Sequence, residues 1–197
     1  MFRKITALAV ATLAATPAIA CDRAGMDELF YGVISSGQRS FQEPVPIAPP
    51  AIPYTDANGV ERTLGDNDGK ATIVTFWHPD CIGCKIDLPR LDGFLKDNPD
   101  LDRDQFLQIS IEELNEGPRN EFVDRDDVRD FLASKSFDAI DGNIDMGNKV
   151  FTATCLIATP SHLMINREGK VTDVLFGPLK WSEEPFAGIA RNYLANY

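Results

Sequence analysis

The sequence ATIVTFWHPDCIGCK, residues 71–85, is the most informative part of this chain. Residues 71–77 are apolar, β-branched or aromatic, which is typical of a buried strand. Residues 85–95, which follow, space their apolar side chains as a helix does. We therefore expect a strand, a short loop and a helix, with Cys81 and Cys84 at the start of the helix.

The position of Cys81 at a helix N-terminus predicts a reactive thiol. Backbone N–H groups there lack partners inside the helix, and the helix dipole favours a negative charge. A thiolate carries such a charge, so the Cys81 thiol should be acidic and nucleophilic. Cys84 lies one helical turn further on, within reach of Cys81 and more enclosed. This spacing predicts a reversible dithiol/disulfide couple.

Two other interpretations of the Cys81–Cys84 pair are weaker. A structural zinc ion needs four ligands, usually from a second Cys or His pair. A purely structural disulfide would close so small a ring that it removes little chain entropy. We expect no metal site, and we interpret both histidines as ordinary, partly exposed residues. The residues that remain as candidate ligands form no second pair; they are Cys21, Cys155, His78 and His162.

The N-terminus has the pattern of a secretory signal. Basic residues at positions 3 and 4 precede an apolar run over residues 5–15, and a small-residue cleavage site ends at Ala20. The apolar run is too short for a comfortable membrane span. We interpret residues 1–20 as a signal peptide and expect a periplasmic or otherwise exported protein.

Two interpretations of Cys21 stay open. It directly follows the predicted cleavage site, where bacterial lipoproteins carry their lipidated cysteine, so the protein would then be lipid-anchored. Alternatively, Cys21 and Cys155 form a structural disulfide that ties the mature N-terminus to the core, as an oxidising compartment allows. A lipid on the Cys21 sulfur would prevent that bond, and Cys155 would then be a buried free thiol.

Composition argues against some partners. Asp and Glu number 30 and Lys and Arg number 19, so the formal net charge is −11. Removal of residues 1–20 takes away Arg3 and Lys4 and changes this charge to −13. Phosphate backbones repel such an acidic protein, so we expect no nucleic-acid partner. The 177 residues that remain suffice for one core.

The order of elements predicts an α/β fold. Alternating strands and helices give a mainly parallel central sheet with helices on both faces, to which a closing hairpin adds antiparallel strands. Residues 21–45 are expected to be an N-terminal segment and linker, and residues 46–197 the folded domain. Strands are expected at residues 52–54, 60–64, 71–77, 105–111, 161–166 and 171–176, and helices at 81–96, 126–132, 148–156 and 181–193.

Two details of this prediction concern surfaces. Residues 112–124 are polar and look like an inserted loop. In the last helix, Phe186, Ile189 and Leu194 are expected to face the core.

Four separated features of residues 46–197 point to a known family. Thr75-Phe76-Trp77 precedes Cys81-Ile82-Gly83-Cys84-Lys85, Asp87 lies three residues after the second cysteine, and Pro89 interrupts the helix. Thr159-Pro160 stands before a strand and a hairpin turn at residues 163–170. These features resemble the thioredoxin superfamily, and within it the TlpA/ResA-like exported thiol–disulfide oxidoreductases. The turn at residues 56–59 also looks like part of their N-terminal extension.

The resemblance implies a thioredoxin-like fold with this N-terminal extension, and a mechanism. Cys81 would attack a partner disulfide, and Cys84 would resolve the mixed disulfide. Asp87 would act as a general base toward the Cys84 thiol. Thr159 and a cis-Pro160 would bind an extended substrate segment, and Trp77 would pack beside the active loop on the substrate side.

Two departures from the family affect the reduction potential. Asp80 stands where an aromatic residue is usual, and its carboxylate should disfavour the neighbouring thiolate. Ile82-Gly83 replaces the more usual Gly-Pro or Pro-His pair. The potential of this chain therefore cannot be taken from its relatives by analogy.

The function we predict is an exported reductase of protein disulfides in cytochrome c or cytochrome oxidase assembly. Electrons would come from a membrane thiol carrier, because the periplasm is oxidising. We expect no cofactor beyond the Cys81–Cys84 disulfide, since the sequence has no NAD or flavin motif. The alternatives are a disulfide oxidase or isomerase, and a copper-binding chaperone that uses both cysteines and a histidine. A thiol peroxidase is disfavoured, because His78 stands where such sites need Thr or Ser.

Overall fold

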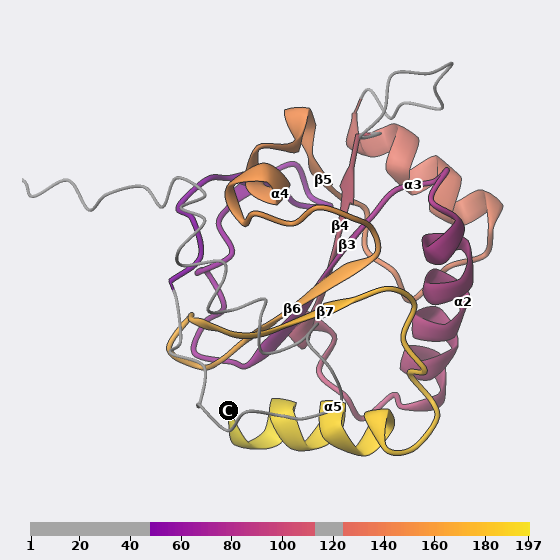
Figure 1. Cartoon of the computed structure of the whole chain (residues 1–197). Helices are drawn as coiled ribbons and strands as arrows, with labels where there is room; N and C mark the ends of the chain where they lie inside the picture. The colour runs from indigo at the N-terminus through magenta and orange to yellow at the C-terminus, as the bar shows by residue number, and fades with distance from the viewer. Residues whose placement is uncertain (1–47, 113–123) are drawn as a thin grey trace, which may run out of the picture.

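The computed structural model describes residues 48–112 and 124–197 (Figure 1). In these residues the strands form one mixed sheet, in the order β2-β1-β5-β4-β3-β6-β7. The strands are β1 (Tyr54–Thr55), β2 (Glu61–Arg62), β3 (Thr72–Trp77), β4 (Phe106–Ile111), β5 (Asn143–Asp145), β6 (Ser161–Ile165) and β7 (Val171–Phe176). The helices are α2 (Ile82–Asp97), α3 (Arg125–Ser134), α4 (Lys149–Ala153) and α5 (Phe186–Asn196), with short 3₁₀ turns η1 (Arg103–Gln105) and η2 (Met146–Asn148).

β3 is an interior strand and joins the parallel part of the sheet to the hairpin of β6 and β7. β3 runs parallel to β4 and antiparallel to β6. β4 in turn runs parallel to β5, and β6 forms an antiparallel hairpin with β7. β1 pairs antiparallel with β5 and with β2 at the far edge. The predicted α/β fold with a mixed central sheet is therefore confirmed.

Alternation along β3 divides the core into two layers. Ile73 and Trp77 pack with buried side chains of α2, α3 and α5 on one face of the sheet. Val74 and Phe76 pack with Val150 and other apolar residues on the opposite face, which α4 covers. Figure 1 shows α2 and α3 on one side of the sheet and α4 on the other. Both faces of the central strands are thus closed to water, as apolar burial requires.

The C-terminal helix differs from its prediction. The sequence predicts a helix from residue 181, but α5 begins at Phe186, after Pro185 at the N-cap. Residues 181–185 instead form a turn that brings Trp181 into the core, where it is fully buried. The buried stripe of α5 is Ala187, Ala190, Tyr193 and Leu194, with helical spacing. Ile189 lies off this stripe and is 47% exposed, so its predicted place in the core is wrong.

The predicted strands at residues 52–54 and 60–64 are shorter than expected, and a carboxylate holds the turn between them. Asp56 accepts hydrogen bonds from the backbone N–H groups of Asn58 and Val60 and pairs with Arg62 at 2.8 Å. Gly59 has a φ of +83°, which favours glycine. The Asp56–Gly59 turn predicted from the sequence is confirmed.

Several predictions lie outside the described residues. They concern the signal peptide at residues 1–20, the linker at residues 21–45 and most of the inserted loop at residues 112–124. These remain predictions.

The corrected face of α5 can be tested by two substitutions in the same helix. Leu194→Ala should lower the free energy of unfolding by about 2–3 kcal/mol, because it leaves a cavity in the core. Ile189→Ala should change it by less than about 0.5 kcal/mol, because this side chain is largely in water. Urea denaturation of the two variants measures both values. An equal loss in both variants would contradict the assignment of the buried face.

Candidate active site

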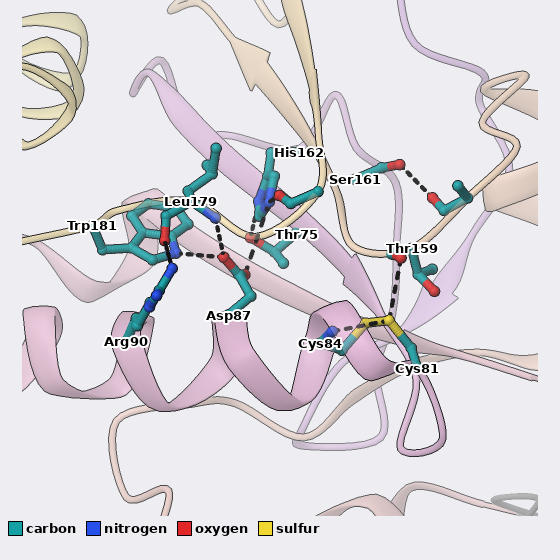
Figure 2. Close-up of polar contacts among 12 residues, drawn as sticks. Thr75, Cys81, Cys84, Asp87, Arg90, Thr159, Ser161, His162, Leu179 and Trp181 are labelled. Carbon is teal, nitrogen blue, oxygen red and sulfur yellow. Dashed lines mark hydrogen bonds and ion pairs between the residues drawn. A yellow bond between two sulfur atoms is a disulfide. The ribbon is translucent and has the colours of Figure 1, made fainter.

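The two cysteines lie where the central strand passes into α2, and they form a disulfide (Figure 2). Cys81 is the N-cap of α2, and its Sγ accepts a hydrogen bond of 2.9 Å from the backbone N–H of Cys84. Cys84 is only 1% exposed, whereas Cys81 is partly exposed. An approaching reagent therefore meets Cys81 first. The N–H group that contacts its Sγ would stabilise a thiolate at this position.

A loop distant in sequence covers the first turn of α2. The Thr159–Pro160 peptide bond is cis, as the family resemblance implies, and the Thr159 carbonyl oxygen lies 3.2 Å from Cys81 Sγ. A Cβ on Gly83 would come within 2.8 Å of Pro160 Cδ. Real Cβ atoms do not approach so closely, so glycine is needed at position 83 for this packing.

Asp87 projects from α2 into the protein interior, one turn after Cys84. It is completely buried, and its Oδ1 accepts hydrogen bonds from the Leu179 N–H (2.7 Å) and from Trp181 Nε1 (3.0 Å). Its Oδ2 has no hydrogen-bond partner among the described residues. Burial raises the pKa of the carboxyl from 3.8 to about 6, although the two hydrogen bonds and Arg90 act in the opposite direction.

His162 faces Asp87 from β6, as Figure 2 shows. The His162 side chain is completely buried. Its Nε2 lies 3.8 Å from Asp87 Oδ2 and 3.2 Å from the Gly177 carbonyl oxygen. Its Nδ1 lies 3.0 Å from Thr75 Oγ1. Burial lowers the pKa of the ring from 6.5 to about 4, so the imidazole is neutral at pH 7.

The expectation that both histidines are partly exposed is wrong. His162 lies on a strand whose two faces are both covered, so no alternating position on it reaches water. His78 is 8% exposed, and its Nδ1 accepts a hydrogen bond from the backbone N–H of Asp80. Both rings are thus internal, and each accepts or makes at least one hydrogen bond through a ring nitrogen.

Trp77 and Asp80 lie on either side of the active loop. Trp77 is completely buried and its ring packs 5.7 Å from that of Phe131 on α3, so it lies beneath the loop and presents no surface to a substrate. Asp80, which the sequence analysis regards as unfavourable for a thiolate, lies 3.8 Å from Lys85 Nζ. This exposed ion pair offsets part of the negative charge beside Cys81.

Cys155 follows α4 at a distance in sequence from the catalytic pair. It is 8% exposed and does not stand as a free thiol. Its predicted partner, Cys21, lies outside the described residues, so the pairing and the lipidation of Cys21 stay predictions.

Residues 48–112 and 124–197 lack a metal-binding cluster and a membrane-spanning helix. These residues contain no group of three or more His, Cys, Asp or Glu side chains that could hold a metal ion. They also contain no helix that is both long enough and apolar enough to cross a bilayer.

The polar environment of Asp87 is not predicted from the sequence. His162, Thr75 and Trp181 all contribute to it, and the contact between Asp87 and Trp181 joins residues 94 positions apart. One signal was available. Cys84, Leu88 and Leu91 define the buried stripe of α2 by their spacing, and position 87 lies on the same stripe, so an aspartate there predicts a buried carboxyl.

Comparisons with known proteins agree with this geometry. No family model matches the chain. Sporulation thiol-disulfide oxidoreductase A of Bacillus subtilis (strain 168) is 23% identical over 156 residues, which cover 75% of this chain and 87% of that protein.

Solved structures show the same fold. The crystal structure of StoA from Bacillus subtilis has a TM-score of 0.52 at 20% identity, and covers 75% of this chain and 98% of its own. A thioredoxin-family thiol:disulfide interchange protein from Chlorobium tepidum TLS has a TM-score of 0.54 at 20% identity. The match covers 76% of this chain and 97% of that protein. The exposed lipoprotein thioredoxin Etrx1 from Streptococcus pneumoniae strain TIGR4 has a TM-score of 0.51 at 18% identity, and covers 72% and 96%.

The chain therefore has the thioredoxin fold and is similar to the TlpA/ResA-like thiol–disulfide oxidoreductases of the thioredoxin superfamily.

Proposed function

We propose that this protein is an exported thiol–disulfide oxidoreductase that reduces protein disulfides, with a role in cytochrome c or cytochrome oxidase assembly. The observation that carries the proposal is the arrangement of the Cys81–Cys84 disulfide. One sulfur is accessible at a helix N-terminus, the other is buried beneath it, and a cis-proline loop lies alongside.

The reaction follows from the different exposure of the two sulfurs. In the reduced protein, the Cys81 thiolate attacks a substrate disulfide, forms a mixed disulfide and releases one substrate thiolate. The Cys84 thiol then loses its proton and attacks Cys81 Sγ. The Cys81–Cys84 bond forms, the mixed disulfide breaks, and the second substrate thiolate leaves and takes up a proton. The substrate gains two electrons, and the protein ends in the oxidised state described here.

Asp87 is our candidate for the general base in the second step. It lies one turn after Cys84 on the same helix, and burial brings its pKa close to 6, so it is largely ionised at neutral pH yet basic enough to accept a proton. In the reverse direction, the protonated carboxyl would return the proton to the Cys84 thiolate when a donor dithiol attacks Cys81.

Substrate binding is proposed for the loop beside Cys81. Thr159 is partly exposed and its carbonyl oxygen already contacts Cys81 Sγ, so an extended peptide could pair with this backbone while its own sulfur faces Cys81. Gly83 and Pro160 fix the distance between the loop and the helix.

The compartment and electron donor are proposed from the sequence. Residues 1–20 have the pattern of a signal peptide, and a structural neighbour is described as an exposed lipoprotein. Outside the cytosol, oxidised protein has to be reduced again by a membrane thiol carrier, because no soluble pool there keeps thiols reduced. Cys21 either anchors the protein through a lipid or bonds with Cys155.

Trapping tests the nucleophile. With Cys84→Ser in the full-length protein, mixed disulfides on Cys81 should accumulate in the native compartment, because the resolving sulfur is gone. Mass spectrometry of the captured species identifies the partners. Cys81→Ser is the matched control and should capture none. Equal capture by the two variants would refute the assignment of Cys81 as the attacking residue.

The reduction potential tests the direction of electron flow. A reductase should have a potential closer to the value of about −270 mV of thioredoxin than to the value of about −120 mV of a strong periplasmic oxidant. Equilibration with dithiothreitol and glutathione buffers, followed by alkylation of free thiols, measures it. A reduction potential near that of the strong oxidant would favour the oxidase or isomerase alternative. Stoichiometric binding of Cu(I) by the reduced protein, lost with Cys84→Ser, would favour the copper chaperone.

The role of Asp87 predicts a pH profile. The rate of mixed-disulfide resolution should rise with pH through about 6 and then level off, because the carboxyl acts as a base only when ionised. Asp87→Asn should slow this step by about 100-fold at pH 7 and remove the inflection. Stopped-flow mixing with a peptide disulfide separates this step from the first attack.

A matched control lies on the same helix. Asp92 is also buried, but it pairs with Lys96 at 2.7 Å and accepts a hydrogen bond from the Ala139 N–H. Asp92→Asn should therefore leave the inflection in place. If Asp87→Asn kept the wild-type profile, Asp87 would not be the base.

A further inference from the structure

The mechanism above gives no task to His162, although this side chain lies close to the oxygen of Asp87 that has no hydrogen bond. Its Nε2 lies 3.8 Å from Asp87 Oδ2, and both side chains have no exposed surface. Asp87 Oδ1 is already occupied by two donors, so Oδ2 is the atom that is left to receive a proton.

The hydrogen bonds of the ring determine which nitrogen carries its proton. The Gly177 carbonyl oxygen, 3.2 Å from Nε2, can only accept, so Nε2 must carry the hydrogen. Nδ1 then accepts a hydrogen bond from the Thr75 hydroxyl at 3.0 Å. Because the neutral ring has a single N–H, these two contacts fix the Nε2–H tautomer.

A proton fixed on Nε2 interacts differently with the ionised and the protonated carboxyl of Asp87. The N–H donates to the Gly177 carbonyl oxygen, but its nitrogen lies 3.8 Å from Oδ2, so the electropositive edge of the ring attracts the carboxylate. A protonated Oδ2 would present a second hydrogen to the same N–H and would find no acceptor there. The same tautomer cannot take a proton from Asp87, since Nε2 is already occupied.

No other described titratable group shares this role. On α2, Arg90 is the only charge with a Coulombic effect on Asp87, and its Nη1 is directed to the Leu179 carbonyl oxygen. From β3 the Thr75 hydroxyl contacts the ring. From β7 Leu175 lies opposite His162 in register, and from the C-terminal segment the Trp181 ring packs edge-on at 5.5 Å. Two effects act on the pKa of the His162 ring: burial lowers it, and the hydrogen bond with Gly177 raises it.

We propose that His162 is a positioning residue that favours the ionised, proton-accepting form of Asp87, because its proton-bearing Nε2, which donates to the Gly177 carbonyl oxygen, lies 3.8 Å from Asp87 Oδ2. The consequence for catalysis rests on the proposed function, in which Asp87 is the base for Cys84. The pairing itself does not depend on that function, so the two can be tested separately.

The test measures the titration of Asp87 directly in the oxidised full-length protein. Carbon-13 NMR of the labelled aspartate carboxyls should show that His162→Phe, which keeps a flat ring but has no donor, moves the Asp87 midpoint upward by about one pH unit. His162→Gln, whose amide keeps an N–H group near Oδ2, should stay within about half a unit of wild type. An unchanged or lowered midpoint in His162→Phe would overturn the proposal, because a residue that only packs would not raise it.

The wild-type protein provides a test that does not depend on the folding of a variant. Nitrogen-15 NMR should show His162 as the Nε2–H tautomer throughout pH 5–8, with its shifts following the titration of Asp87. An Nδ1–H ring, or a ring that gains a proton in this range, would refute the proposal.

Kinetics separate the failure of this proposal from the failure of the proposed function. Under both, the inflection in the rate of mixed-disulfide resolution moves upward with the Asp87 midpoint in His162→Phe. If the NMR midpoint moves but the inflection does not, the pairing of His162 and Asp87 stands and the role of Asp87 as base is wrong. If neither moves, the inference about His162 is wrong, whatever Cys84→Ser captures.

Discussion

Close packing of the first turn of α2 against the Thr159–Pro160 loop positions the chemistry of this protein. The helix carries both sulfurs. The loop places the Thr159 carbonyl oxygen 3.2 Å from Cys81 Sγ. Gly83 makes this approach sterically feasible, since any larger residue would need the rigid ring of Pro160 to move. The placement of the sulfurs relative to the proposed peptide-binding backbone depends on this one contact.

Beneath the disulfide, the protein places ionisable groups where water does not reach them. A buried carboxylate without a cation beside it is unfavourable, and the structure reduces this cost with two N–H donors on Asp87 Oδ1. The remaining oxygen faces a neutral imidazole instead of a positive charge. This arrangement leaves the carboxyl weakly acidic, which suits a group that has to gain and lose a proton near neutral pH.

The sequence predicts local structure and the reacting atoms well, because those signals are local. The strand–loop–helix pattern of residues 71–97 locates both cysteines, and the Asp56–Gly59 turn is confirmed. Contacts between distant segments were not predictable from spacing. The spacing of apolar residues predicts a helix that begins at Trp181. In the structure the Trp181 side chain is instead buried in the core beside Asp87. His162 looked ordinary because alternation along a strand does not reveal that both faces of β6 are covered.

The long separation between these contacts has a consequence for biosynthesis. A nascent chain that ends before residue 159 contains both cysteines of α2 but lacks the carbonyl beside Cys81 and the indole that holds Asp87. Its thiols could oxidise, yet the surroundings that tune their chemistry would not exist. The complete surroundings of Cys81 and Asp87 therefore form only after residues 159–181 have been made and have docked against α2.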